Sequence, residues 1–218
     1  MKKIIAIFLA AALMSSCCGG DVRNARGLAS RIMGPGAKTV VFEKADFGTD
    51  CFELSSKGSR VLIRANNSGS MATGLNYYLK NYCNASVSWY DYNPVALPAT
   101  LPEVPEPVKV KACVEDRFFL NYCTFGYTMP WWGWKEWERF IDWMALNGVN
   151  MPLAITGEEA VWQKVWRRFG MTDEQIRSFF TGPAYLPWHR MINIDRWQGP
   201  LPQHWIDSQA ELQKRILK

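Results

Sequence analysis

The pattern of apolar and polar positions divides the chain into two regions. In the first, short runs that contain apolar residues predict four strands, at Lys38–Lys44, Cys51–Leu54, Arg60–Ala65 and Val87–Tyr90. Apolar residues recur at helical spacing over Met71–Cys83, and Ser70 has the character of an N-cap. This region is expected to form a small α/β domain, with one main helix against a sheet and no catalytic constellation.

The second region alternates strands with helices. Strands are predicted at Arg117–Thr124 and Val149–Ile155, and helices at Gly133–Leu146, Glu158–Arg168, Ile176–Phe180 and Gln203–Lys218. Thr156 with Glu159, and Thr172 with Gln175, have the spacing of capping boxes. Strand–helix alternation is typical of a parallel βα architecture, and a whole (β/α)₈ barrel needs about 250 residues. The expected fold class is therefore α/β, a small N-terminal domain followed by the first units of an incomplete TIM-like barrel.

Five prolines separate the two regions and predict an extended connector over residues 93–110. The small domain is then expected over residues 27–92, and the truncated barrel domain over residues 111–218.

Residues 1–20 have the pattern of a bacterial export signal. A positive start with Lys2 and Lys3 precedes the apolar run Ile4–Met14, which is too short to span a bilayer. Small residues before Cys17 resemble a lipoprotein cleavage site, so we expect Cys17 to be lipidated; an ordinary signal peptide cleaved nearby is the alternative. Both alternatives predict export, to the periplasm or the cell surface. Lipidation of Cys17 would add a lipid anchor, which is the expected membrane attachment. Residues 19–26 are expected to be a short linker.

Composition narrows the classes of function. The chain has 218 residues, 48% hydrophobic and 21% charged, which is typical of a globular protein. The net charge of +5 forms no basic stripe, so no nucleic-acid partner is expected. With His189 and His204 as the two histidines, neither a metal site nor a cofactor is expected. A Cys51–Cys83 disulfide and two free buried thiols are both compatible with the sequence.

Aromatic residues provide the first candidate chemistry, because ten of the eleven tryptophans lie between Trp131 and Trp205. Tryptophans at helical spacing are expected in the core, namely Trp134, Trp137, Trp143, Trp162 and Trp166. Those expected in loops could contact a ligand, namely Trp131, Trp188 and Trp197. The loop beginning at Tyr127 follows a predicted barrel strand, at the end where barrel sites are built, and aromatic faces there can stack on sugar rings.

Polar candidates lie nearby. Asn121 and Cys123 are two residues apart on a predicted strand and would share one face. Glu158 and Glu159 are adjacent carboxylates, although capping already explains Glu159. Arg190 and Asp195 flank a loop and could bind a ligand or each other.

Four long motifs resemble the α-N-acetylglucosaminidases of glycoside hydrolase family 89: Asn121–Thr124, Trp131–Glu138, Ile141–Asn150 and Phe179–Trp188. Gly199–Pro202 fits the same pattern. The resemblance runs from Arg117 to the end of the chain, and residues 38–110 resemble the family's small N-terminal domain more weakly.

The resemblance implies an exported, retaining exo-hydrolase that removes terminal α-linked N-acetylglucosamine from a glycan substrate. It matches Asn121, Cys123, Tyr127 and Trp188 to the family's terminal-sugar subsite, whereas Ile192–Asn193 departs from the family dipeptide. In the family both catalytic glutamates lie on later barrel strands, one of them within an Asn–Glu pair that this sequence does not supply. An N-terminal fragment without catalytic residues, itself inactive, is therefore expected. The alternative is a non-catalytic surface lipoprotein or carbohydrate-binding remnant, and the continuation of the gene would distinguish the two.

Overall fold

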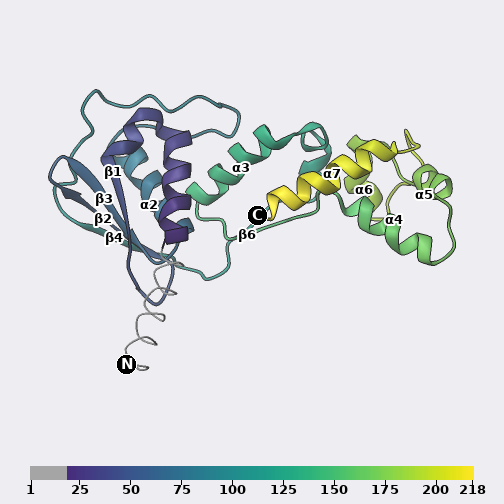
Figure 1. Ribbon diagram of the computed structural model, residues 1–218, viewed down its shortest axis with the longest axis horizontal. Helices are drawn as coiled ribbons and strands as arrows, with labels where there is room; N and C mark the ends of the chain where they lie inside the picture. Colours follow the sequence, from purple (N-terminus) through teal and green to yellow (C-terminus); the bar gives the residue numbers. More distant parts are fainter. Residues whose placement is uncertain (1–18) are drawn as a thin grey trace, which may run out of the picture. The chain divides into compact units, whose positions relative to one another are not determined.

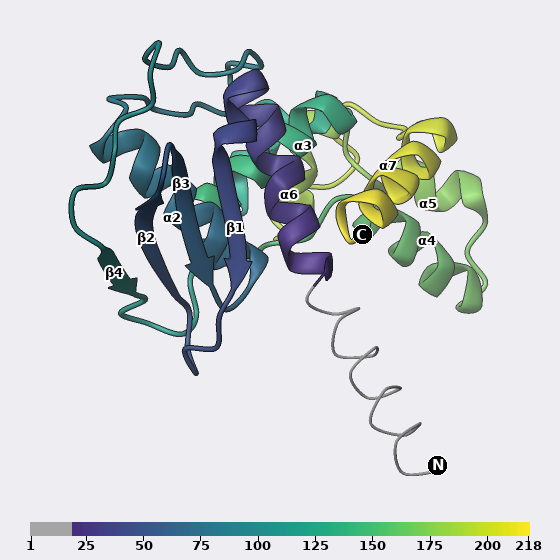
Figure 2. The ribbon, with the colours of Figure 1, turned by 60° about the vertical axis from the view of Figure 1, so that its left-hand side comes forward.

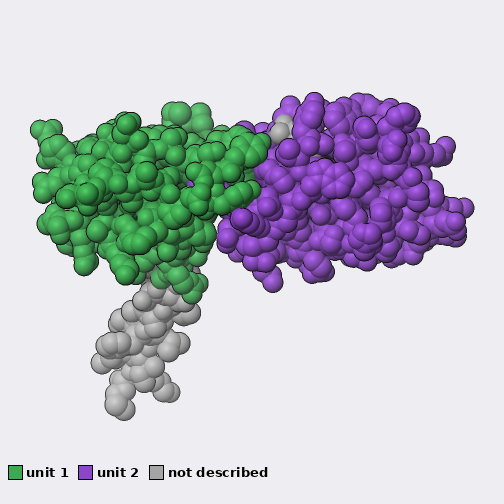
Figure 3. Space-filling model, turned by 90° about the horizontal axis from the view of Figure 1, so that it is seen from above, with its two compact units in different colours: residues 1–117, 140–150 green, residues 118–139, 151–218 purple. Residues whose placement is uncertain are grey.

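A computed structural model describes residues 19–218, apart from the side chains of residues 124 and 125. The predicted signal run and Cys17 lie outside the described residues. The chain forms two compact units, shown in different colours in Figure 3. The first unit contains residues 19–117 and 140–150, and the second contains residues 118–139 and 151–218. Within residues 19–218, no helix has the length and apolar character needed to cross a membrane.

The first unit is built on a four-stranded sheet in the order β1-β3-β2-β4, part of which is visible in Figure 2. Its strands are β1 (Val40–Lys44), β2 (Cys51–Lys57), β3 (Arg60–Ala65) and β4 (Val108–Lys111). β1 runs parallel to β3, and the other pairs are antiparallel. The predicted strand Val87–Tyr90 is wrong, because β4 pairs with β2 while Val87 is buried in the core without joining the ladder.

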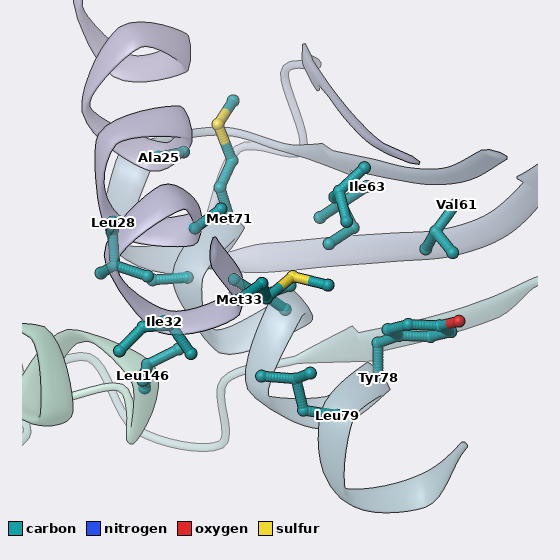
Figure 4. Close-up of a cluster of buried hydrophobic side chains, with 14 of the residues drawn as sticks. Ala25, Leu28, Ile32, Met33, Val61, Ile63, Met71, Tyr78, Leu79 and Leu146 are labelled. Carbon is teal, nitrogen blue, oxygen red and sulfur yellow. The ribbon is translucent and has the colours of Figure 1, made fainter. Parts of the chain in front are cut away.

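Three helical segments complete this core: a helix over residues 19–33, α2 (Ser68–Asn81) and the end of α3 (Trp134–Leu146), which contributes Leu146 (Figure 1). The expected linker over residues 19–26 is wrong: the segment is helical and Ala25 is 2% exposed, because the helix has an apolar face to bury. The cap of α2 is Asn67, whose side chain accepts from the Ser70 backbone N–H at 2.8 Å, so Ser70 lies inside the helix. Figure 4 shows buried side chains of the cluster, among them Ala25, Leu28, Ile32, Met33, Val61, Ile63, Met71, Tyr78, Leu79 and Leu146.

The proline-rich segment contains no helix or strand before β4, and part of it lies against the same core. Val104 is 4% exposed, and the Tyr78 hydroxyl donates to the Pro102 carbonyl at 2.8 Å. The segment therefore covers apolar surface as well as connecting elements. Cys51 and Cys83 are free thiols, both buried in the first unit.

The second unit begins with β5 (Phe118–Phe119), which pairs in parallel with β6 (Met151–Pro152). The parallel arrangement confirms the predicted βα order, but each strand is two residues long, much shorter than predicted. After Phe119, whose carbonyl accepts from the Leu153 N–H at 2.8 Å, the chain turns into η2 (Cys123–Gly126). Local turns thus replace the longer predicted ladder.

Helices form the rest of the second unit: the start of α3 (Trp134–Leu146), α4 (Glu158–Arg168), α5 (Asp173–Phe179), α6 (Leu186–Arg190) and α7 (Gln203–Ile216), with 3₁₀ turns η3 (Met129–Trp131) and η4 (Pro183–Tyr185). Their shared core contains Ile176, Phe180, Leu186, Leu201 and Ile206.

One of the two predicted capping boxes forms. Thr172 and Gln175 make both reciprocal hydrogen bonds at the start of α5. At α4 the N-cap is Gly157, at a φ of 75°, and no side chain caps the helix. The prediction that Thr156 and Glu159 form a capping box is therefore wrong, because the Glu159 carboxylate has a different partner.

Candidate functional site

The turn after β5 carries two of the predicted site residues. The Asn121 side-chain oxygen accepts from the Cys123 backbone N–H at 2.9 Å, which closes a local turn ahead of η2. The expectation that these residues share one face of a strand is wrong for that reason. Asn121 is exposed and Cys123 is half-buried, so both still present polar atoms close to the carboxyl ends of β5 and β6.

This turn packs directly on α6, the helix that contains Trp188. A Cβ added at Gly126 would lie 2.7 Å from Cζ3 of Trp188 and 2.8 Å from the Ala184 carbonyl oxygen. The ring of Tyr127 meets that of Trp188 edge to face, with 6.2 Å between centroids. Trp188 is thus held in a helix, where the sequence predicted a loop, and the segment that follows Asn121 and Cys123 packs against it.

Two of these four side chains offer aromatic surface. Tyr127 is 72% exposed and Trp188 is half-buried. Asn121 and Cys123, in the turn that leads into η2, add an amide and a thiol. An aromatic surface with neighbouring hydrogen-bonding groups can bind the apolar face of a sugar ring and its hydroxyls together.

A buried ion pair lies among the same elements, and sequence reasoning missed it. The Arg190 guanidinium donates to both carboxylate oxygens of Glu159, at 2.7 and 2.9 Å. The two side chains are 4% and 2% exposed. Arg190 therefore pairs with Glu159 rather than with Asp195, and Glu159 pairs with Arg190 rather than capping its helix. No local signal in the sequence links two residues that are 31 positions apart. Burial raises the pKa of Glu159, while the neighbouring Arg190 opposes that shift.

Glu158 extends this pair toward the turn. Its carboxylate accepts from the Tyr122 hydroxyl at 3.2 Å and from Nε1 of Trp162 at 3.2 Å. Nε of Arg190 lies 3.6 Å from the same carboxylate. Burial and the charge of Glu158 raise the pKa of Tyr122, which keeps the phenol protonated as a donor. We refer to Tyr122, Glu158, Glu159 and Arg190 as the Arg190 network.

The other candidates lie elsewhere or serve the core. Trp131 and Trp197 are 66% and 56% exposed, whereas Trp137 is 4% exposed. Trp197 and Asp195 line a cavity of about 890 Å³ between α4, α5 and the segment after α6, together with Ile192 and Asn193. The four predicted site residues do not line this cavity. Trp134, Trp143, Trp162 and Trp166 are partly buried.

Two family models match the chain. The α-N-acetylglucosaminidase TIM-barrel domain matches residues 117–218, and the α-N-acetylglucosaminidase N-terminal domain matches residues 23–103. Together with the parallel β5–β6 pair, the first match assigns residues 117–218 to part of a TIM-barrel domain of the class found in glycoside hydrolases. The chain belongs to the α-N-acetylglucosaminidase family, glycoside hydrolase family 89.

Sequence identity and structural similarity to members of this family support the membership. The human α-N-acetylglucosaminidase is 41% identical over 209 residues, which cover 91% of this chain and 28% of the human protein. A family 89 glycoside hydrolase from Clostridium perfringens, in complex with 2-acetamido-1,2-dideoxynojirimycin, is 40% identical with a TM-score of 0.85, over 93% of this chain and 23% of that one. A second structure of the bacterial enzyme has a TM-score of 0.83 at 40% identity, over 89% of this chain and 22% of that one. It carries two glutamate-to-glutamine substitutions and holds its substrate, GlcNAc-α-1,4-galactose. This chain therefore spans about a quarter of the length of the relatives that it matches.

Proposed function

We propose that this chain is part of an exported, exo-acting α-N-acetylglucosaminidase that hydrolyses terminal α-linked N-acetylglucosamine with retention. In this proposal the described residues supply the N-terminal domain and one wall of the terminal-sugar subsite. The observation that carries it is the packing of the Asn121–Tyr127 turn on Trp188, which gathers aromatic and hydrogen-bonding groups in one place.

Each residue has a role in the proposed subsite. Trp188 and Tyr127 provide aromatic surface for the sugar ring, and Asn121 and Cys123 provide polar contacts to its substituents. The bound GlcNAc-α-1,4-galactose of the bacterial relative supports this class of ligand.

Retention requires two carboxyl groups about 5–5.5 Å apart, one acting as acid/base and one as nucleophile. The adjacent pair in this chain is poorly suited to that role, because Glu159 is buried against Arg190 and Glu158 is held by Tyr122 and Trp162. We therefore place the catalytic glutamates outside this chain, as the family resemblance implies.

Export is the second part of the proposal. The apolar run Ile4–Met14 and the small residues before Cys17 support secretion with lipidation of that cysteine. Labelling with a palmitate analogue should mark the wild-type chain in a bacterial host. Equal labelling of a variant without Cys17 and Cys18 would exclude the lipid anchor.

Binding tests the sugar site. The purified chain should bind GlcNAc-α-1,4-galactose, measured by saturation-transfer NMR, and Trp188→Ala should abolish the signal. Trp205→Phe is the matched control, because Trp205 is also partly buried in the second unit but packs on its core. Equal binding by both variants would contradict the assignment of Trp188.

Hydrolysis tests the placement of the catalytic groups. We expect no turnover of a chromogenic α-N-acetylglucosaminide by this chain. Turnover that Glu158→Gln abolishes would show that the network carboxylates perform the chemistry, and the proposal would fail. Sugar binding by a chain whose gene ends after Lys218 would favour the non-catalytic alternative.

A further inference from the structure

The Arg190 network joins the segments that carry the sugar-binding residues. Tyr122 lies between Asn121 and Cys123 in the turn after β5. Arg190 lies two residues after Trp188 in α6. Glu158 and Glu159 open α4, shortly after β6. The four side chains of the network therefore link two segments to the start of α4: the turn that contains Asn121 and Cys123, and the helix that contains Trp188.

We propose that this network positions the sugar-binding turn against Trp188, with Tyr122 as the positioning residue that acts on Asn121 and Cys123. This inference rests on the proposed function and deepens it. It assigns to Tyr122 an effect on sugar affinity without direct contact with the sugar.

The base of the network is fixed. Arg190 and Glu159 are almost inaccessible and joined by two hydrogen bonds, and such pairs lose stability when one partner moves away. The start of α4 is fixed too, because a Cβ at Gly157 would lie 2.7 Å from the Gln209 carbonyl oxygen. Glu158 therefore presents its carboxylate to Tyr122 from a rigid support.

The hydrogen bond from Tyr122 to Glu158 can be removed while the Arg190–Glu159 ion pair stays in place. Removing its hydroxyl leaves Glu158 with Trp162 and Arg190 as partners, so no buried charge is stranded. The turn would lose this hydrogen bond to α4, while the aromatic ring at position 122 would be retained. Tyr122→Phe thus separates positioning from the general stability of the second unit.

The first measurement needs no ligand. Cys123 lies next to Tyr122 and is half-buried, whereas Cys113 is exposed in the first unit. In the purified chain we expect Tyr122→Phe to raise the rate of Cys123 alkylation by iodoacetamide about threefold to tenfold relative to Cys113, resolved by peptide mass spectrometry. Tyr185→Phe is the control, because Tyr185 lies in the second unit like Tyr122, and it should leave that ratio unchanged. An unchanged ratio in Tyr122→Phe would overturn the positioning role, whether or not the chain binds sugar.

The second measurement tests whether the Arg190 network affects ligand affinity. Tyr122→Phe should weaken binding of 2-acetamido-1,2-dideoxynojirimycin about threefold to tenfold, with an unfolding midpoint close to that of the wild type. Glu158→Gln, which keeps an acceptor for Tyr122, should retain more affinity than Glu158→Ala. Equal affinities of Tyr122→Phe and wild type would refute the positioning role. Absence of binding by the wild type would count against the proposed function, while the alkylation ratio would still decide the positioning role.

Discussion

Arg190 and Glu159 form a bidentate ion pair of 2.7 and 2.9 Å in the interior of the second unit. The pair connects the end of α6 with the first turn of α4. Because both side chains are almost inaccessible, neither charge has water as an alternative partner. Loss of one partner should therefore cost much more than loss of a surface ion pair.

Glu159→Leu should lower the free energy of unfolding of the second unit by about 3–5 kcal/mol, because Arg190 loses its bidentate partner while still buried. Combining it with Arg190→Met should recover part of this loss, since both charges then leave the interior. Urea unfolding of the two single variants and the double variant, followed by tryptophan fluorescence, measures the coupling. Additive effects in the double variant would show that the two residues are independent.

The first unit should lose stability in acid through Asp50. Burial raises the pKa of Asp50, but hydrogen bonds from Arg117, Asn67 and Asn66 outweigh it and lower the pKa overall. A carboxyl group with a lowered pKa in the folded state stabilises the fold above its unfolded pKa of about 4, and this contribution is lost as pH falls through the folded value. Asp50→Asn should flatten that part of the stability profile below pH 4.

The matched control for this acid dependence is Asp46→Asn. Asp46 is exposed and accepts one hydrogen bond, from the Gly48 N–H at 2.9 Å. Circular dichroism of both variants between pH 2 and pH 6 provides the comparison. Identical profiles for Asp50→Asn and wild type would refute the assignment.

His189 should make the second unit less stable as pH falls below about 6.5. Burial lowers the pKa of His189, and the Ile194 backbone and the charge of Asp195 oppose this shift only in part. The His189 ring contacts the rings of Trp162, Phe179 and Phe180. The unfolded chain therefore takes up a proton at a pH where the folded chain does not, which favours unfolding.

Thermal unfolding of His189→Gln between pH 5 and pH 8 tests this expectation. The variant should show a shallower pH dependence than the wild type. His204→Gln is the control, because His204 is an exposed histidine on α7. A His189→Gln profile parallel to that of the wild type would contradict the prediction.

Gly157→Ala should destabilise the second unit more than Gly170→Ala does. Both glycines have a positive φ, of 75° and 85°, so each substitution should cost about 1–2 kcal/mol in backbone strain. At Gly157 the new Cβ would also lie 2.7 Å from the Gln209 carbonyl, whereas nothing lies within 4 Å at Gly170. Overpacking should add about 1–3 kcal/mol at Gly157, measured by urea unfolding. Equal losses would show that the structure relaxes around Gly157.

Local patterns in the sequence determined several elements. The strand Arg60–Ala65 has its predicted bounds, and the Thr172–Gln175 capping box forms as expected. Both depend on residues close together in the chain, whose side-chain alternation or reciprocal hydrogen bonds need little from the rest of the fold. The family motifs also predicted Asn121, Cys123, Tyr127 and Trp188 as site residues, and the structure packs the η2 segment against Trp188.

Only the tertiary structure determined where the strands end and which residues distant in the sequence become partners. The short β5 and β6 end where turns replace ladder hydrogen bonds, which the apolar runs alone did not predict. Glu159 has the spacing of a capping residue, but the stronger partner is a guanidinium 31 residues away. Desolvation makes that choice, because a carboxylate enclosed by α4 and α6 must pair with the buried cation. The sequence therefore identified the candidate sugar-binding residues, and only the fold determined which partners hold their segments in place.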